Sequence, residues 1–275
     1  RKQLSFINMR GNVVIGEGEL DEAPMLYVNE KVGNQNGPEL DIAVDPLEGT
    51  NFTAKNLPNA LSVMAISTKN NILKAPDVYM EKIAVGPNLP KKIIDLDFPI
   101  EKNISLLASA KKKKIESLTA CILKRPRHDF IVNSLNNMGV KIKFIDDGDV
   151  SGVISVADTD SNIDIFIGTG GAPEGVLAAA ALSCLDCQMQ TRLKFEDENQ
   201  KNKAKALGIM DLDKKYNIED MIKSDVIFTA TGVTDGELVS GVKDCGNFFQ
   251  TETYALHKSA NTKKKIVSKI NKNEL

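Results

Sequence analysis

Short runs of apolar residues recur along the chain, and most of them have the length of a strand rather than a helix. In the first 100 residues these runs follow one another with polar turns between them, which predicts a strand-rich region. The run at residues 60–67 (ALSVMAIS) is apolar almost throughout, and we expect a strand buried on both faces. Further extended segments are expected at residues 12–15, 41–45 and 76–86.

After about residue 100 the pattern alternates between strands and helices, which is typical of an α/β fold. Residues 127–138 carry apolar side chains at helical spacing, and Gly139 follows as a stop signal. Strands are expected at residues 118–123, 140–145, 163–167 and 225–231, and helices from residue 104 and at 127–138, 150–157 and 173–185. We therefore predict two subdomains, a strand-rich one over residues 1–100 and an α/β one over residues 101–275, with an approximate boundary.

Composition is that of an ordinary globular protein. The 275 residues include 42% apolar and 26% charged residues, and the net charge is −2. A chain so close to neutral gives no reason to expect a nucleic acid or a membrane as partner. The lysine runs at 111–114 and 263–265 are interpreted as solvated faces, with weak steering of an anionic substrate as the alternative.

The four cysteines are Cys121, Cys184, Cys187 and Cys245. The sequence has no signal-peptide pattern and no long apolar span, so we expect a cytoplasmic protein with reduced thiols. Cys184 and Cys187 form a C-x-x-C pair, but without a second pair or a nearby histidine we interpret them as buried structural residues. The chain does not begin with Met, and we expect that the natural protein has a further segment ahead of it.

The most informative stretch is DPLEGT at residues 45–50. It is expected to be a tight acidic turn after a strand, with Asp45 and Glu48 on either side of Pro46. Carboxylates this close repel each other unless a cation lies between them, and Mg²⁺ and Mn²⁺ prefer oxygen ligands of this kind. A metal site with the hydroxyl of Thr50 beside it favours hydrolysis of a phosphate ester. An acidic surface turn is the alternative.

Two more carboxylates, Glu17 and Glu174, also follow apolar runs. Together with Asp45 and Glu48 they are sufficient to hold two or three divalent ions. Thr50 is then the candidate for orienting the attacking water, and Asp21 is the candidate base.

Three further motifs are suited to a phosphorylated sugar. The glycine pair at 170–171 offers backbone N–H groups ahead of a helix, and Arg125-Pro126-Arg127 presents two guanidinium groups to a phosphate. Asp147-Gly148-Asp149 suits sugar hydroxyls, and Tyr79 can close over a sugar or donate to a phosphate. A plain turn, a surface basic pair and an interior tyrosine are the respective alternatives, and His128 is assigned no role. The turns at 146–149, 168–174 and 232–236 are expected to share one cleft, because each follows a strand.

Several of these segments together resemble the class II fructose-1,6-bisphosphatases. The similarity runs in the same order from about residue 11 to about residue 242, and its motifs are GEGELDEAPM at 16–25, DPLEGT at 45–50, YMEK at 79–82, RPRH at 125–128, DGDV at 147–150 and GGAPEGV at 170–176.

The resemblance implies the layered αβαβα fold of the lithium-sensitive phosphatases. It also implies a Mn²⁺- or Mg²⁺-dependent hydrolase, with two or more ions per site, that removes the 1-phosphate of fructose 1,6-bisphosphate in gluconeogenesis. We further expect a homo-oligomer, a dimer or a tetramer. By similarity the metal ligands are Glu17, Asp45, Glu48 and Glu174, and Thr50 assists the attacking water, whereas Asp21 is a candidate base on its position alone. By the same similarity the substrate ligands are Glu48, Gly49, Thr50, Tyr79, Arg125, Pro126, Arg127, Asp147, Gly148, Asp149 and Gly171.

The chain departs from the family in two places. The family carries a glycine-rich segment with an aspartate ligand and a lysine ahead of the first strand, and this sequence begins after that point. The segment at 257–262 follows the family only loosely, so no site is transferred from there. The rival functions are a sedoheptulose-1,7-bisphosphatase or dual enzyme, an inositol- or nucleotide-phosphate phosphatase, and a protein that binds phosphosugars without hydrolysing them.

Overall fold

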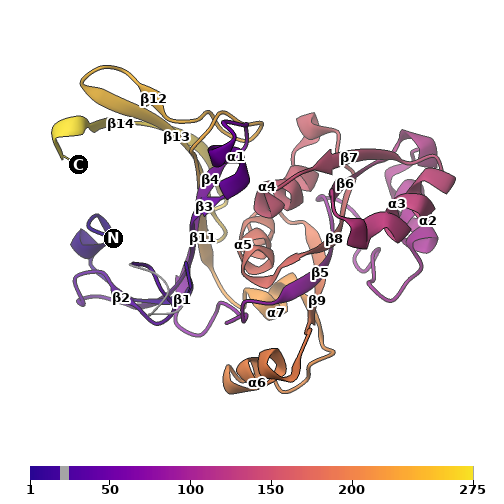
Figure 1. Cartoon of the computed structure of the whole chain (residues 1–275), viewed down its shortest axis with the longest axis horizontal. Coiled ribbons are helices and arrows are strands. Elements are labelled where there is room, and N and C mark those ends of the chain that lie inside the picture. Colours follow the sequence, from indigo (N-terminus) through magenta and orange to yellow (C-terminus); the bar gives the residue numbers. More distant parts are fainter. Residues whose placement is uncertain (19–24, 275) are drawn as a thin grey trace. The chain divides into compact units, whose positions relative to one another are not determined.

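The computed structural model describes residues 1–18 and 25–274, and the chain forms two compact units (Figure 1). The first unit combines Arg1–Lys74 with Ile222–Leu275, and the second is the continuous segment Ala75–Met221. This division differs from the predicted division into residues 1–100 and 101–275. The last strands of the chain pair with the sheet that the first residues form, so the first unit contains both ends of the chain.

The first unit is built on one eight-stranded mixed sheet in the order β12-β13-β11-β4-β3-β1-β2, with β14 also paired to β13. Only β1 and β3 run parallel among these pairs, and the other pairs are antiparallel. The strands are β1 (Arg10–Ile15), β2 (Lys31–Val32), β3 (Glu39–Glu48), β4 (Leu61–Thr68), β11 (Val226–Gly232), β12 (Lys243–Asp244), β13 (Phe248–His257) and β14 (Thr262–Asn271). Three short helices accompany them, namely α1 (Thr50–Ala54) and the 3-10 helices η1 (Leu4–Phe6) and η6 (Lys272–Glu274).

Strand β4 shows how the sequence pattern maps onto this sheet. Every second residue from Leu61 to Ser67 is buried, and the residues between them are half-buried. We expected both faces of this strand to be buried, but only one face is fully buried and the other is half-buried. Met64 and Ile66, on the half-buried face, pack against the core that Val13, Ile42 and Val44 contribute.

The second unit has a six-stranded sheet in the order β10-β9-β5-β8-β6-β7. Strands β8, β6 and β7 are parallel, whereas β5, β9 and β10 add antiparallel pairs. The strands are β5 (Tyr79–Val85), β6 (Thr119–Leu123), β7 (Lys141–Ile145), β8 (Ile165–Gly171), β9 (Gln188–Lys194) and β10 (Lys215–Asn217).

Helices cover both faces of this second sheet (Figure 1). Helices α2 and α3 pack against Ile83 and Val85 of β5, whereas α5 contacts the other face of β5 and also packs on α4 and α7. The helices are α2 (Ile100–Lys111), α3 (Asp129–Asn137), α4 (Asp149–Ile154), α5 (Ala172–Ser183), α6 (Glu198–Ala206) and α7 (Ile218–Met221), with 3-10 turns η2 (Ile115–Ser117), η3 (Pro126–His128), η4 (Ser155–Ala157) and η5 (Thr159–Ser161). The predicted α/β fold class is confirmed.

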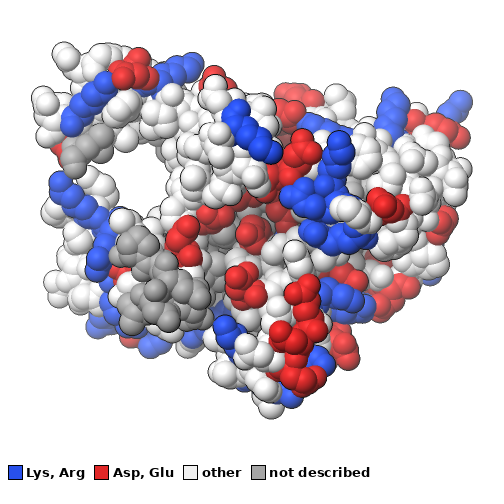
Figure 2. Space-filling model, viewed as in Figure 1, with Lys and Arg blue, Asp and Glu red and all other residues white. Residues whose placement is uncertain are grey.

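Both signs of charge are present on the face shown in Figure 2, as the net charge of −2 leads one to expect. Within the described residues, no helix has the length and apolar character needed to cross a bilayer. None of the four cysteines forms a disulfide. Of the pair predicted to be buried, Cys184 is buried and Cys187 is only half-buried, while Cys121 is buried and Cys245 is exposed.

Candidate active site

The acidic stretch of the first unit lies at the end of β3. The predicted turn is wrong in detail, because β3 continues through Glu48 and contains a bulge instead. Asp45 is opposite Val63 and Glu48 is opposite Leu61, so three steps along β3 match two along β4. The bulge leaves the Glu48 side chain buried, with only 3% of the residue exposed. Asp45 Oδ1 accepts a hydrogen bond from the Leu47 N–H at 3.0 Å.

The turn follows at Gly49, directly before α1. Gly49 has a φ of +83°, a value that disfavours any residue with a side chain. A Cβ at this position would also lie 2.8 Å from the ring of Phe52. Thr50 is the first residue of α1 and is exposed, and it follows the buried Glu48 by two residues.

The topology brings Glu17 to the same edge of the sheet as Asp45. Strands β1 and β3 are parallel neighbours, with Ile15 opposite Ala43. Glu17 and Asp45 each lie two residues beyond this pair, so both come from the carboxyl ends of adjacent strands. Glu17 is exposed, and its N–H donates to the Leu26 carbonyl at 3.0 Å. The candidate base Asp21 lies outside the described residues.

The glycine pair of the second unit belongs to a strand and not to a loop. Strand β8 runs through Gly171, which is opposite Tyr79 of β5, and α5 begins at the next residue. A side chain on Gly170 would overlap the carboxylate of Asp149, and one on Gly171 would overlap that of Glu174. The pair therefore makes room for two carboxylates, a function that differs from the predicted donation of backbone N–H groups.

Glu174 lies in the first turn of α5, as the sequence predicted. Its Oε2 atom is buried and has no hydrogen-bond partner among the described residues. Burial raises the pKa of the Glu174 carboxyl, and the nearby Lys82 ammonium opposes that increase. A buried carboxylate oxygen without a donor fits a divalent cation, since the cation would supply the missing charge.

Asp149 is the better defined of the two predicted sugar-binding carboxylates. It is the first residue of α4, preceded by Gly148 with a φ of +80°, and only 7% of it is exposed. Asp149 Oδ2 forms an ion pair with the fully buried ammonium of Lys82, and Oδ1 is buried without a hydrogen-bond partner among the described residues. Asp147 is half-buried at the start of this turn.

Arg127 and Tyr79 form a pair on the opposite face of β5 from Lys82. The guanidinium carbon of Arg127 is 4.7 Å from the centre of the Tyr79 ring, within the range of a cation–π contact. Arg127 Nε and Nη2 donate to the Thr169 carbonyl at 3.1 and 2.8 Å. Tyr79 is 40% exposed, which excludes the alternative of an interior tyrosine. Pro126 begins η3, and Arg125 is half-buried with Nη1 donating to the Lys124 carbonyl.

The structure gives His128 a positional role that the sequence did not indicate. The ring is buried, its Nδ1 is 2.7 Å from the Leu123 carbonyl, and Nε2 accepts from the Thr169 N–H at 2.8 Å. These partners require the neutral tautomer with the proton on Nδ1. Burial lowers the pKa of His128, and the charge of Arg127 adds to that effect, although the backbone hydrogen bonds oppose it. His128 thus connects β6 to β8 beside Arg127.

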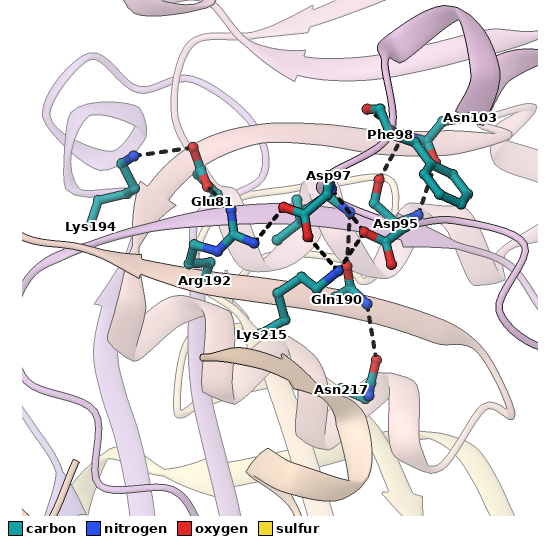
Figure 3. A network of polar contacts seen from close by, with 11 residues as sticks. Glu81, Asp95, Asp97, Phe98, Asn103, Gln190, Arg192, Lys194, Lys215 and Asn217 are labelled. Atoms are coloured by element: carbon teal, nitrogen blue, oxygen red, sulfur yellow. Dashed lines mark hydrogen bonds and ion pairs between the residues drawn. The ribbon is translucent and has the colours of Figure 1, made fainter. Parts of the chain in front are cut away.

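A network of ion pairs includes Glu81 of β5, which is two residues beyond Tyr79 in the sequence (Figure 3). Glu81 lies between Arg192 and Lys194 of β9, at 3.8 and 3.4 Å. Arg192 and Lys215 both pair with Asp97, at 2.5 and 2.7 Å. The hydrogen bonds from Lys215 and Arg192 lower the pKa of the Asp97 carboxyl. The network therefore attaches the loop before α2 to β9 and β10, and no local sequence motif indicated it.

The predicted common cleft assumed that all three segments follow strands of one sheet, and that assumption is wrong for the third. Residues 146–149 follow β7, residues 168–174 cover the end of β8 and the start of α5, and β7 and β8 belong to one sheet. The turn at 232–236 follows β11, which belongs to the sheet of the first unit. Sequence order alone could not assign β11 to a sheet.

The four predicted metal ligands come from both units: Glu17, Asp45 and Glu48 from the first, and Glu174 from the second. Across residues 1–18 and 25–274, no group of three or more His, Cys, Asp or Glu side chains is arranged to hold a metal ion. The coordination of shared ions by all four stays a prediction.

Comparison with known proteins agrees with the motifs. The family model described as "Bacterial fructose-1,6-bisphosphatase, glpX-encoded" matches residues 1–270. A class 2 fructose-1,6-bisphosphatase of Haemophilus influenzae is 44% identical over 282 residues, covering 98% of this chain and 84% of that protein. The fructose-1,6-bisphosphatase 1 class 2 of Escherichia coli K12 and the class 2 enzyme of Shigella flexneri are each 43% identical, covering 98% of this chain and 83% of theirs.

Proposed function

Because the chain belongs to the bacterial, glpX-encoded family of class 2 fructose-1,6-bisphosphatases, we propose that it hydrolyses fructose 1,6-bisphosphate. The products are fructose 6-phosphate and inorganic phosphate, and the step belongs to gluconeogenesis. The observation that carries the proposal is an identity of 43–44% over 98% of the chain to relatives that bear this name. The site motifs lie inside the matched region, at residues 1–270.

The carboxylates Glu17, Asp45, Glu48 and Glu174 are the proposed ligands of two or more Mn²⁺ or Mg²⁺ ions. Carboxylate oxygens are the donors that these ions prefer, and a bound cation would stabilise the negative charges of the buried Glu48 and of Glu174, whose carboxyl pKa is raised by burial. When bound, such ions activate a water and stabilise the charge on the leaving oxygen.

Thr50 is the proposed residue that orients the attacking water. Thr50 is an exposed residue two positions after the buried Glu48, and its hydroxyl can both accept and donate a hydrogen bond next to the proposed metal ligands. Asp21 is proposed to take the proton from that water, because the sequence places this carboxylate four residues after Glu17 in the same acidic segment.

The proposed substrate-binding residues form two groups, one for a phosphate and one for the sugar hydroxyls. Arg125 and Arg127 are proposed to bind a phosphate, and the exposed ring of Tyr79 to pack beside the sugar or donate to that phosphate. Two of the donors of Arg127 are held by Thr169, which fixes the direction of the remaining ones. Asp147 and Asp149 are proposed to accept hydrogen bonds from sugar hydroxyls, and the remaining proposed ligands are Glu48, Gly49, Thr50, Pro126, Gly148 and Gly171.

Phosphate release with Mn²⁺ from a panel of substrates tests the function. The panel is fructose 1,6-bisphosphate, sedoheptulose 1,7-bisphosphate and inositol 1-phosphate, tested on this chain and on a version extended at its N-terminus. Fructose 1,6-bisphosphate should give the highest kcat/KM. A best rate on inositol 1-phosphate would overturn the proposal. Equal rates on both bisphosphates would establish a dual enzyme, and binding without turnover by the extended version would favour a phosphosugar-binding protein.

We propose a cytoplasmic location and a homo-oligomeric state in addition. The location is supported by four free thiols, which suit a reducing compartment. The oligomer is expected as a dimer or a tetramer, and light scattering of the purified protein would distinguish these from a monomer.

A further inference from the structure

Lys82 is one of the largest fully buried side chains of the described residues. It lies in the middle of β5, where Met80 and Ala84 on the same face are also buried. An ammonium group removed from water costs several kcal/mol unless it is paired, and apolar replacements of buried ion pairs are often more stable. Stability alone therefore does not account for a lysine at this position.

Two glycines make room for the lysine and its partner. A Cβ on Gly175 of α5 would lie 3.0 Å from Lys82 Cε and 2.5 Å from Met80 Sδ, so α5 can cross β5 here only without a side chain. A Cβ on Gly170 would overlap the Asp149 carboxylate. The absence of side chains at Gly170 of β8 and Gly175 of α5 therefore leaves the space in which Lys82 and Asp149 form their ion pair.

The charges around the Lys82–Asp149 ion pair do not balance. Lys82 carries one positive charge, and two buried carboxylates lie near it, those of Asp149 and Glu174. Each carboxylate keeps one buried oxygen without a hydrogen-bond partner among the described residues, namely Asp149 Oδ1 and Glu174 Oε2. Buried acceptors are costly when unsatisfied, which indicates that a ligand supplies what the protein does not.

We propose that Lys82 is a positioning residue of the substrate site, whose buried ammonium holds Asp149 Oδ2 so that Oδ1 can accept a hydroxyl of the sugar phosphate. The inference rests on the proposed function, because that function gives Asp149 its sugar ligand. Asp149 has two rotatable side-chain bonds at the start of a helix of only six residues, and the ion pair removes that freedom before the sugar binds. Lys82 itself has no exposed atoms with which to contact a ligand.

The test measures the affinity for fructose 6-phosphate by calorimetry in the presence of Mn²⁺, which needs no turnover. Lys82→Met removes the charge and keeps an apolar chain of similar length. We expect its affinity for fructose 6-phosphate to fall by about tenfold or more, because a hydrogen bond to a held carboxylate is lost. The KM for fructose 1,6-bisphosphate should rise to a similar extent while kcat changes by less. Lys141→Met, at an exposed position of β7 in the same sheet, is the matched control and should bind like the unmodified chain.

A second pair of variants separates positioning from folding. If Lys82 acts through Asp149, the double variant Lys82→Met/Asp149→Asn should bind no more weakly than Asp149→Asn alone. The double variant removes both charges of the Lys82–Asp149 pair, so neither partner is left as an unpaired buried charge, and it serves even if Lys82→Met fails to fold. A further tenfold loss in the double variant would overturn the inference. So would Lys82→Met with a lowered melting temperature and unchanged affinity. Failure of the unmodified chain to bind fructose 6-phosphate would overturn the proposed function instead, and with it the ligand assumed here.

Discussion

Glu48 is the metal-ligand candidate whose environment is best defined in the first unit. We expect Glu48→Gln to weaken Mn²⁺ binding by about tenfold or more, because a neutral amide replaces a buried carboxylate ligand. Titration calorimetry with Mn²⁺ measures the change. The matched control is Glu39→Gln, an exposed position on the same strand that pairs with Lys69, and it should leave the affinity unchanged. Equal Mn²⁺ affinities of Glu48→Gln and the unmodified chain would remove Glu48 from the ligand set.

Arg127 should contribute mainly to binding of the substrate. Arg127→Ala is expected to raise the KM for fructose 1,6-bisphosphate by about tenfold to a hundredfold, since a charge-assisted hydrogen bond to phosphate contributes about 1.5–3 kcal/mol. Steady-state kinetics would show the split between KM and kcat, with the exposed Lys124→Ala as control. A loss confined to kcat would mean that Arg127 acts on the reacting phosphate rather than on binding.

Clusters of polar residues could be singled out from the sequence, and residues that depend on distant partners could not. The acidic and arginine-containing segments were found because several polar residues stand together after apolar runs. Lys82 and His128 lie within the YMEK and RPRH segments, but their roles depend on burial and on partners 67 and 41 residues away in sequence. The room that the glycine pair at 170–171 leaves for two carboxylates was also not predictable, since those carboxylates are brought beside it only in three dimensions, whereas binding of an anion by its N–H groups stays a prediction.

At the scale of elements, periodic segments were predicted well and irregular ones were missed. Helices α3 and α5 and strands β4, β6 and β7 lie within one or two residues of their predicted bounds at most ends. The sequence analysis did not predict strand β9, helix α6 or the hairpin of β13 and β14. These segments are rich in polar residues, so their few apolar positions do not show a clear strand or helix spacing. In β14 nearly every residue is exposed, so neither face carries an apolar stripe.

The turn of that missed hairpin is held by Asp225, which gives a prediction about pH. Burial alone would raise the pKa of Asp225, but hydrogen bonds from the Ser259 hydroxyl, from His257 Nε2 and from the Ser259 N–H, at 2.7, 2.9 and 2.8 Å, lower it to about 2. The folded-state pKa lies below the ordinary value of 3.8, so the stabilisation is present above about pH 4 and disappears as the pH falls toward 2.

We therefore expect Asp225→Asn to lower the free energy of unfolding by about 1 kcal/mol at pH 7, a value reduced for the solvent that reaches this side chain. The difference from the unmodified chain should vanish near pH 2. Denaturant titrations at the two pH values measure it. Ser259→Ala keeps the charge and removes one donor, so it should show a smaller loss. A difference that persists undiminished at pH 2 would show that the Asp225 carboxylate is not the stabilising group.

At the scale of the whole molecule, the sequence could not reveal that the chain returns to its first sheet. Strand β11 pairs with β4 over seven residues, although more than 150 residues separate the two strands. Long-range pairing of this kind depends on register and shape, which single-sequence periodicity does not contain. The apparent boundary near residue 100 marks a change in local pattern, whereas the compact units are defined by which strands hydrogen-bond.

This topology predicts that the two units differ in their ability to fold alone. Ala75–Met221 is continuous, contains all six strands of its sheet and has its own apolar core, so we expect it to unfold cooperatively as an isolated segment. Residues 1–74 alone should not, because β4 would lose β11 and expose the hydrogen-bonding edge of a central strand. Thermal unfolding followed by circular dichroism, together with the dispersion of amide NMR signals, distinguishes the two.

The matched control rejoins the first unit without the second. Ile72 forms a bridge with Ile222, and the Lys223 N–H donates to the Asn71 carbonyl at 2.9 Å, so the two pieces meet where the second unit leaves and returns. A short flexible linker between residues 74 and 222 should therefore restore cooperative unfolding to the first unit. Cooperative folding of residues 1–74 alone would show that β11–β14 are an addition to a complete sheet. Failure of Ala75–Met221 to fold would show that its core needs the first unit.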